Sequence, residues 1–478
     1  MTESGPRGPR RRSAQAPSQR SRRTDPARQA AFDVLRAVEA DDAYANLVLP
    51  TVLRERRVRG RDAAFATELA YGALRGRGLY DAVLAHCVDR PLERLDAPVL
   101  DVLRLGAHQL LAMRVPTHAA VSESVALARS AVGAGAGGFV NAVLRRVAER
   151  DADAWVAEVA PDAVADPVGH LAVARSHPGW VVRALREALV SHGRPVGELD
   201  ALLEADNDRP VVTLAARPGL ATVDELVASG AAPGRWSPVA AVLPAGDPGA
   251  VAAVRDGRAR VQDEGSQLAA LALLAADVEG RDERWADLCA GPGGKAALMA
   301  AVAAQRGASL VAVEAAPHRA RLVEQALAGT PGEVQVRTGD GAEVGTDEPG
   351  VYDRVLVDVP CTGLGALRRR PEARWRRQPS DLATLAPLQR RLLGSALDAV
   401  RPGGVVAYVT CTPHPAETVA VVDDVLRRRD DVERLDSPAL VRAAAGRDVP
   451  DLGHGPSAQL WPHRHGTDAM FVAVLRKS

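Results

Sequence analysis

The second half of the chain alternates two kinds of segment, and this alternation constrains the possible fold most strongly. From about residue 262, short apolar runs alternate with segments that repeat apolar residues at helical spacing. Strands that alternate with helices form βαβ units around a parallel sheet. We predict a Rossmann-like α/β domain over residues 256–478, with its ligand at the carboxyl ends of the strands. The expected strands are residues 284–288, 310–314, 333–336, 355–358 and 405–410, with an edge or hairpin strand at 469–475.

The first half of the chain divides into three further regions. Residues 1–25 are rich in Arg, Pro, Ser and Gln and predict a disordered tail that could contact a polyanion. Residues 26–150 repeat apolar residues at helical spacing between glycines and prolines, which predicts an all-α domain. Residues 151–255 mix a helical pattern with a strand pattern at 211–216 and predict a small α/β linker subdomain.

Composition excludes several classes of protein. No apolar run reaches the roughly 18 residues that a membrane span needs. No apolar segment follows the arginine-rich N-terminus, so a secretory signal is not expected. The four cysteines form no CxxC pair, and no Cys/His cluster has zinc spacing. We expect a cytoplasmic protein with free thiols and without a metal, and the sequence gives no indication of an oligomeric state.

A glycine-rich loop joins the first expected strand of the α/β domain to the following helix. Its glycines allow a ligand to approach the backbone closely at a helix N-terminus. A phosphate-binding P-loop would need a different pattern, which Cys289 and Ala296 break at both ends. A dinucleotide fingerprint does fit Gly291, Gly293 and Ala296, so the glycines alone leave that alternative open. The loop consists of Cys289, Ala290, Gly291, Pro292, Gly293, Gly294 and Lys295.

Acidic residues at the ends of successive strands distinguish the possible ligands. Glu314 ends the second strand, Asp340 follows the third, and Asp358 ends the fourth. Glu314 can accept both hydroxyls of a ribose, and Asp340 is expected near an adenine. Several carboxylates around one crevice suit a nucleoside that bears a cationic sulfonium better than they suit a pyrophosphate. We therefore predict a binding site for S-adenosylmethionine formed by the glycine-rich loop and these three residues.

Two cysteines follow neighbouring strands of the expected sheet. Cys361 follows the fourth strand and Cys411 ends the fifth, so both thiols should lie in the same crevice. Packing explains Cys87 and Cys289 better than it explains this pair. A thiolate that adds to C6 of cytosine makes C5 able to accept a methyl group, and a second thiol can assist release. Asp358 would stabilise the adduct through a hydrogen bond to the base, but spacing does not show which thiol attacks.

A strongly basic segment follows Cys361. Residues 367–377 read LRRRPEARWRR and are expected at the lip of the crevice. Arginines can bind phosphates, and a tryptophan can stack on an unpaired base. We predict RNA contacts at Arg368, Arg369, Arg370, Arg374 and Trp375.

Several motifs together resemble a known family. They are CAGPGGK, Asp-x-Pro-Cys-x-Gly, Thr-Cys-Thr with Glu417 downstream, QDEGSQ at residues 262–267 and GTDAMF at residues 466–471. In this order they resemble the RsmB/Sun family of rRNA cytosine-C5 methyltransferases. HAAVSESV from His118 and GFVNAVLRR from Gly138 resemble the NusB-like RNA-binding domain that this family carries at its N-terminus. The resemblance covers roughly residues 26–478.

The resemblance implies a role for each matching residue. Cys411 would be the nucleophile, and Cys361 would assist release of the product. Cofactor contacts would fall on residues 289–295 and on Glu314, Asp340 and Asp358. The implied substrate is a cytidine in 16S rRNA.

The chain also departs from the family. Val359 and Thr362 stand where the family usually has Ala and Ser, and Gly291 and Ala296 where it often has Ala and Thr. Ala296 lacks a hydroxyl that could touch the cofactor. Two alternatives stay open: an RNA-binding adaptor with an inactive methyltransferase domain, and a DNA cytosine methyltransferase with Cys361 as nucleophile. An amino-group methyltransferase is disfavoured because the Asn/Asp-Pro-Pro-Tyr motif is absent.

Overall fold

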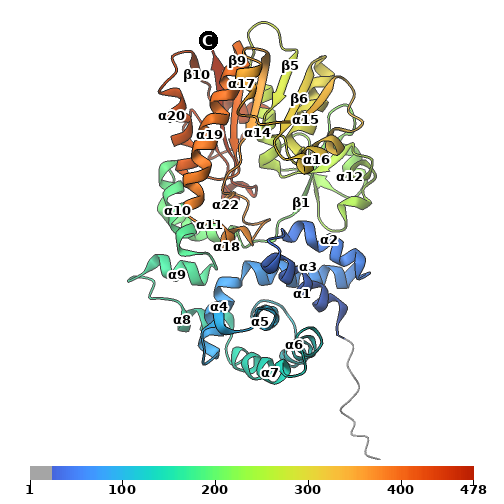
Figure 1. Ribbon diagram of the computed structural model, residues 1–478, viewed down its shortest axis with the longest axis vertical. Helices are drawn as coiled ribbons and strands as arrows, with labels where there is room; N and C mark the ends of the chain where they lie inside the picture. The colour runs from blue at the N-terminus through green and yellow to red at the C-terminus, as the bar shows by residue number, and fades with distance from the viewer. Residues whose placement is uncertain (1–23) are drawn as a thin grey trace, which may run out of the picture. The chain divides into compact units, whose positions relative to one another are not determined.

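The computed structural model describes residues 24–478, so the predicted tail lies, except for its last two residues, outside the described part of the chain. The described chain forms two compact units (Figure 1). The first comprises the described residues up to Asp41 together with Val48–Ala73 and Leu84–Ala152, and the second comprises Asp42–Leu47, Leu74–Val83 and Asp153–Ser478. Among the described residues, no helix has the length and apolar character that crossing a membrane requires.

The first unit is built from helices, as the sequence predicted. Most of α5 is buried, and it packs against α1, α6 and α7. The Arg28 side chain on α1 donates a 2.8 Å hydrogen bond to Gln109 of α5. Helix α2 was not predicted, because Pro50 interrupts its pattern. The elements up to residue 147 are α1 (Pro26–Ala40), α2 (Ala45–Glu55), α3 (Gly60–Arg75), α4 (Arg77–Cys87), η1 (Leu92–Arg94), α5 (Ala97–Leu111), α6 (Thr117–Ala131) and α7 (Ala136–Val147).

The second unit begins with helices and then forms a small antiparallel sheet with strand order β2-β3-β1-β4. Its strand β1 coincides with the strand pattern recognised in the sequence. The helices are α8 (Ala152–Val159), α9 (Pro167–Ala174), α10 (Gly179–Ser191), η2 (Val196–Glu198), α11 (Leu199–Ala205), α12 (Val223–Ala228), η3 (Pro248–Ala250) and α13 (Ala252–Arg255). The strands are β1 (Val212–Ala216), β2 (Ala232–Pro233), β3 (Ala240–Leu243) and β4 (Ala259–Val261).

The rest of the second unit is a doubly wound α/β domain, which confirms the predicted fold class. Its strand order is β10-β12-β9-β8-β5-β6-β7, with β11 paired to β12, and the strands from β9 to β7 are parallel. The chain leaves the sheet edge at β7 and returns as β8 on the other side of β5, so β5 and β8 form the switch point at which such sheets bind ligands.

The five predicted parallel strands are present as β5 to β9, and β8 and β9 begin three and five residues earlier than predicted. The strands are β5 (Arg284–Asp287), β6 (Ser309–Glu314), β7 (Val334–Thr338), β8 (Tyr352–Asp358), β9 (Val400–Thr410), β10 (Val432–Arg434), β11 (Ala458–Gln459) and β12 (Phe471–Lys477). The helices are α14 (Glu264–Ala275), α15 (Gly294–Arg306), α16 (Pro317–Leu327), α17 (Val344–Asp347), α18 (Ala373–Arg376), α19 (Ser380–Ala399), η4 (Pro415–Glu417), α20 (Val419–Leu426), α21 (Ser437–Ala445) and α22 (Pro462–His465).

The last strand is placed differently from the prediction. Strand β12 is not at the edge of the sheet, because it pairs with β9 on one side and with β10 on the other. Its residues 471–475 are buried, and a strand covered on both faces appears in sequence as a continuous apolar run. Strand β10 is short and mostly polar, so no signal for a strand appears there in the sequence. The pairing of β10 with β12 was therefore not predicted.

Helices cover both faces of the large sheet. Alternate side chains of β9 pack against the helices on opposite faces. Val405, Ala407 and Val409 belong to the core cluster that includes α14 and α15. Val406 and Tyr408 belong to the cluster that includes α19 and α20. Figure 1 shows α10, α11, α18 and α22 together at one end of this sheet.

A buried arginine provides a test of this packing. Arg354 of β8 is 3% exposed. Its guanidinium donates to Asp282 and to the carbonyls of Leu273 and Ala276, each at 2.7 Å. The substitution Arg354→Met removes all of these hydrogen bonds, and Asp282 then keeps the indole N–H of Trp285 as a donor. We expect the free energy of opening to fall by about 3 kcal/mol, measured by hydrogen exchange of β8 peptides.

The matched control is Arg337→Met on β7. Arg337 pairs with Glu348 at 2.9 Å, but its side chain is 37% exposed. Exposed pairs of this kind contribute less than about 1 kcal/mol. Equal losses in the two variants would contradict the role given to Arg354.

Candidate active site

The glycine-rich loop lies between the end of β5 and the start of α15. Gly293 has a φ of 100°, in the left-handed region that favours glycine. A Cβ on Gly291 would lie 2.3 Å from Glu314 Oε2, so a side chain there would displace this carboxylate. Instead the Gly291 N–H donates to Glu314 Oε2 at 3.0 Å. The loop and the end of β6 therefore form one surface of backbone and carboxylate.

Two of the predicted cofactor residues, Glu314 and Asp340, follow the strands next to this loop. Glu314 is 4% exposed, and its other carboxylate oxygen accepts from the Ala316 N–H at 3.1 Å. A carboxylate has room for about four hydrogen bonds, so Glu314 can still accept from a ribose. Asp340 is exposed and accepts from the Ala342 N–H at 2.9 Å.

One acidic residue of this region was missed in the sequence. Asp287 at the end of β5 is 1% exposed, and its Oδ2 has no hydrogen-bond partner among the described residues. Burial, with a contribution from the Asp358 charge, raises the pKa of Asp287 to about 7. A carboxyl group at the end of β5, two residues before the glycine-rich loop, was the signal in the sequence. An unpartnered buried oxygen beneath the glycine-rich loop fits a polar ligand there.

The structure brings Cys361 and Cys411 together, as their positions after neighbouring strands predicted. Their Sγ atoms are 3.4 Å apart, and both side chains are half-buried. The hydrogen bond between the thiols lowers the pKa of Cys411, and Lys295 and Arg370 lower it further. The same hydrogen bond, burial and the Glu417 charge raise the pKa of Cys361. Cys411 is therefore the more acidic thiol of the pair.

Lys295 supplies a positive charge that acts on Cys411, and its side chain is 10% exposed. Its Nζ donates to Asp358 Oδ2 at 2.7 Å. Burial alone would lower the pKa of Lys295, but the Asp358 carboxylate outweighs it and raises the pKa. Lys295 therefore stays charged and favours a thiolate at Cys411. The sequence had indicated only a cofactor contact for this residue.

The structure does not support the predicted RNA contact at Arg374. This side chain is fully buried. It donates to Asn207 Oδ1 at 2.7 Å and to the Ser176 carbonyl at 3.0 Å. Sequence shows the charge of a basic segment but not the direction of each side chain, and these acceptors lie far away in the chain. Arg374 therefore holds the segment in place through buried hydrogen bonds.

Arg368 and Arg369 are also bound to other parts of the unit. Arg368 donates to the Gly466 carbonyl at 2.8 Å and lies 3.6 Å from Asp263. Arg369 forms an ion pair with the buried Asp468. The basic segment therefore contacts both the QDEGSQ and the GTDAMF motif. The predicted chemistry assigns no role to these two motifs.

Arg370 and Trp375 differ in their exposure. Arg370 is exposed and lies 5.4 Å above the ring of Tyr44. Trp375 is half-buried, with Arg77 at 5.6 Å from its ring, and a Cβ on Gly78 would lie 2.7 Å from it. Arg370 is thus the residue of this segment that combines exposure with an effect on Cys411.

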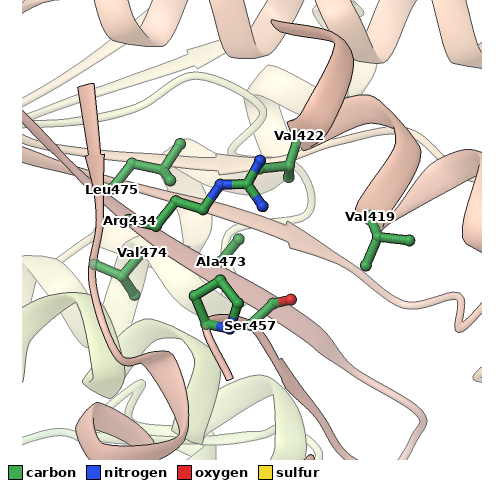
Figure 2. Close-up of a pocket in the computed structure, with 8 residues that line it drawn as sticks. Val419, Val422, Arg434, Ser457, Ala473, Val474 and Leu475 are labelled. Atoms are coloured by element: carbon green, nitrogen blue, oxygen red, sulfur yellow. The ribbon is translucent and has the colours of Figure 1, made fainter. Parts of the chain in front are cut away.

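A small cavity elsewhere in the unit does not coincide with these residues. It has a volume of about 10 Å³ and is lined by residues of α20, β10 and β12, among them Val422, Arg434 and Leu475 (Figure 2). A space of this size holds at most one water molecule, so it is not a substrate site.

The chain is similar to two known families. Residues 273–476 match the family described as 16S rRNA methyltransferase RsmB/F, and residues 25–149 match the NusB family.

Similar proteins span almost the whole chain. MT1451 of Mycobacterium tuberculosis, named as a methyltransferase, is 56% identical over 98% of both chains. Ribosomal RNA small subunit methyltransferase B of Pseudomonas syringae pv. tomato is 30% identical, covering 94% of this chain and 96% of that protein. The solved structure of PH0851 shares the fold, with 21% identity, a TM-score of 0.76 and coverage of 95% and 99%.

Proposed function

The chain belongs to the RsmB/F family of S-adenosylmethionine-dependent 16S rRNA methyltransferases, and we propose from this premise that it methylates C5 of a cytidine through a covalent adduct with Cys411. The observation that supports this most is the pair of thiols 3.4 Å apart, of which Cys411 has the lowered pKa. A single reactive thiol could serve many reactions. Two thiols of different acidity at the end of β8 and β9 suit addition followed by elimination.

The reaction begins at Cys411. Its thiolate adds to C6 of cytosine, and the electron pair of the C5–C6 double bond becomes available at C5. Asp358 accepts a hydrogen bond from the exocyclic amine and orients the base, while Lys295 holds Asp358 in place. Residues 289–295 together with Glu314, Asp340 and Asp358 would hold S-adenosylmethionine, which would supply an electrophilic methyl group to C5.

Release reverses the addition. Cys361 gives its proton to the sulfur of Cys411 as the C6–S bond breaks, and the thiolate left on Cys361 accepts the C5 proton. The C6–S bond breaks, its electron pair stays on sulfur, and the C5–C6 double bond forms again. The 3.4 Å distance between the two Sγ atoms suits this exchange of protons.

The RNA would be held by more than one region. We propose that the NusB-family domain over residues 25–149 contributes to RNA binding. In the methyltransferase domain, the exposed Arg370 can bind a phosphate next to the target base, which must leave its stack to reach Cys411. Arg368, Arg369 and Arg374 instead bind other parts of the unit and hold this segment in place.

Nucleoside analysis tests the proposal. The full-length protein is incubated with methyl-labelled S-adenosylmethionine and unmodified 16S rRNA, and the digested RNA is analysed by mass spectrometry. We expect 5-methylcytidine at one position, which bisulfite sequencing locates. A DNA of the same sequence serves as the control and should stay unmethylated. N4-methylcytidine, or methylation of the DNA instead, would contradict the proposal, and no measurable S-adenosylmethionine binding would favour the adaptor.

A further inference from the structure

Two buried side chains outside the predicted site contact the backbone on both sides of Cys361. Gln389 of α19 donates to the Pro360 carbonyl at 2.8 Å and to Glu417 Oε1 at 3.1 Å. Glu417 Oε1 also accepts from the Thr362 N–H at 2.8 Å. Both side chains are fully buried. We call Gln389 and Glu417 the bracket, because they hold the residue before and the residue after Cys361.

The bracket is also joined to the segment that carries Cys411. The Thr362 hydroxyl donates to Glu417 Oε2 at 2.5 Å and lies 3.3 Å from the hydroxyl of Thr412. The Tyr408 hydroxyl donates to the Glu417 carbonyl at 2.7 Å, which fixes η4 to β9. These contacts restrict movement of one cysteine relative to the other. Small displacements of reacting groups are costly in catalysis, so such restriction matters for a pair of thiols.

Charges around the two thiols differ in a way that the bracket helps to create. Cys361 faces the carboxylates of Glu417 and Asp358, and both disfavour its thiolate. Cys411 also faces Asp358, but Lys295 and Arg370 favour its thiolate. A buried carboxylate costs free energy unless it is hydrogen-bonded, and Glu417 accepts from Thr362 and Gln389.

We propose that Gln389 and Glu417 are positioning residues that hold Cys361 as the protonated partner of Cys411 and so make Cys411 the nucleophile. The proposal rests on the proposed covalent mechanism. It assigns a role to Glu417, which the sequence marked only as part of a motif, and to Gln389, which no motif marked. Neither residue needs to touch the substrate.

Thiol alkylation measures the effect without any methyl transfer. The full-length protein, without cofactor or RNA, is treated with iodoacetamide between about pH 6 and about pH 9, and each cysteine is followed by mass spectrometry. In the unchanged protein we expect Cys411 to react ahead of Cys361. In Glu417→Gln the ratio of the two rates at about pH 7 should fall about tenfold, as for a change of one pKa unit. Gln389→Leu should lower the ratio in the same direction.

Glu372→Gln is the matched control. Glu372 is also a buried glutamate, and it accepts from the Ala45 N–H at 3.1 Å. Its substitution should leave the ratio unchanged. If circular dichroism shows that Glu417→Gln does not fold, Thr362→Val removes only the hydroxyl bonded to Glu417 and should also lower the ratio.

The proposed role of the bracket would be overturned if the ratio of the two alkylation rates in the folded variants stayed within about twofold of that in the unchanged protein. A shift of one pKa unit would change this ratio about tenfold. The test separates the two proposals. A protein whose alkylation order depends on the bracket but which forms no 5-methylcytidine would contradict the proposed function alone.

Discussion

Replacing Cys411 by alanine is expected to reduce methyl transfer at least about a thousandfold, because it removes the thiolate that forms the bond to C6. The measurement is single-turnover transfer of a labelled methyl group to 16S rRNA. Affinity for S-adenosylmethionine should change little, since the glycine-rich loop and Glu314 stay intact. The rate of the unchanged enzyme should rise with pH while Cys411 loses its proton. Because the pKa of Cys411 is lowered, this rise should end below the pH at which an ordinary thiol ionises.

Cys87→Ala is the control for this prediction. Cys87 is buried in the helical unit, and burial raises its pKa, so its thiol is poorly suited to chemistry. Its substitution should preserve transfer to within about threefold, the effect of a small loss of packing rather than of a nucleophile. A Cys411→Ala enzyme that retained a tenth of the activity or more would rule out the adduct at Cys411.

Replacing Cys361 by alanine has a different expected result: the protein accumulates as a covalent complex with RNA. Cys411 can still add to C6 and the methyl group can still be transferred. The C5 proton then lacks its acceptor, so the C6–S bond persists. Turnover should fall about a hundredfold, as when a general acid or base is lost. A labelled rRNA fragment should migrate with the protein on a denaturing gel after incubation with S-adenosylmethionine.

The double variant with alanine at both positions is the control and should trap no RNA. The order of the two thiols depends on this comparison. A complex that forms in Cys411→Ala but not in Cys361→Ala would reverse the roles and make Cys361 the nucleophile. Such a result would also remove the basis for the role given to Glu417.

The parts of the site that follow strands were accessible from the sequence. Glu314 and Asp358 end β6 and β8 as predicted, and Asp340 follows β7. The apolar runs and the helical repeats between them define the order of these strands along the chain. In a doubly wound sheet, the carboxyl ends of parallel strands meet at one edge, so local patterns place residues far apart in the chain together.

The basic segment at residues 367–377 shows what local sequence patterns cannot predict. Its arginines are alike in sequence, but Arg374 is enclosed by Ser176 and Asn207 while Arg370 is exposed. Partners from distant elements decided this difference. Charge in a sequence indicates that a side chain needs an acceptor or solvent, and only the packing shows which of these it finds.

The sequence by itself determined the α/β fold, the glycine-rich loop and the proximity of Cys361 and Cys411. These depend on periodicity and on residue types at the ends of elements, which are local properties. Only the tertiary structure decided that Gln389 and Glu417 contact the chain on either side of Cys361. Their hydrogen bonds join α19, η4 and the segment after β8, and no spacing rule links side chains on three separate elements.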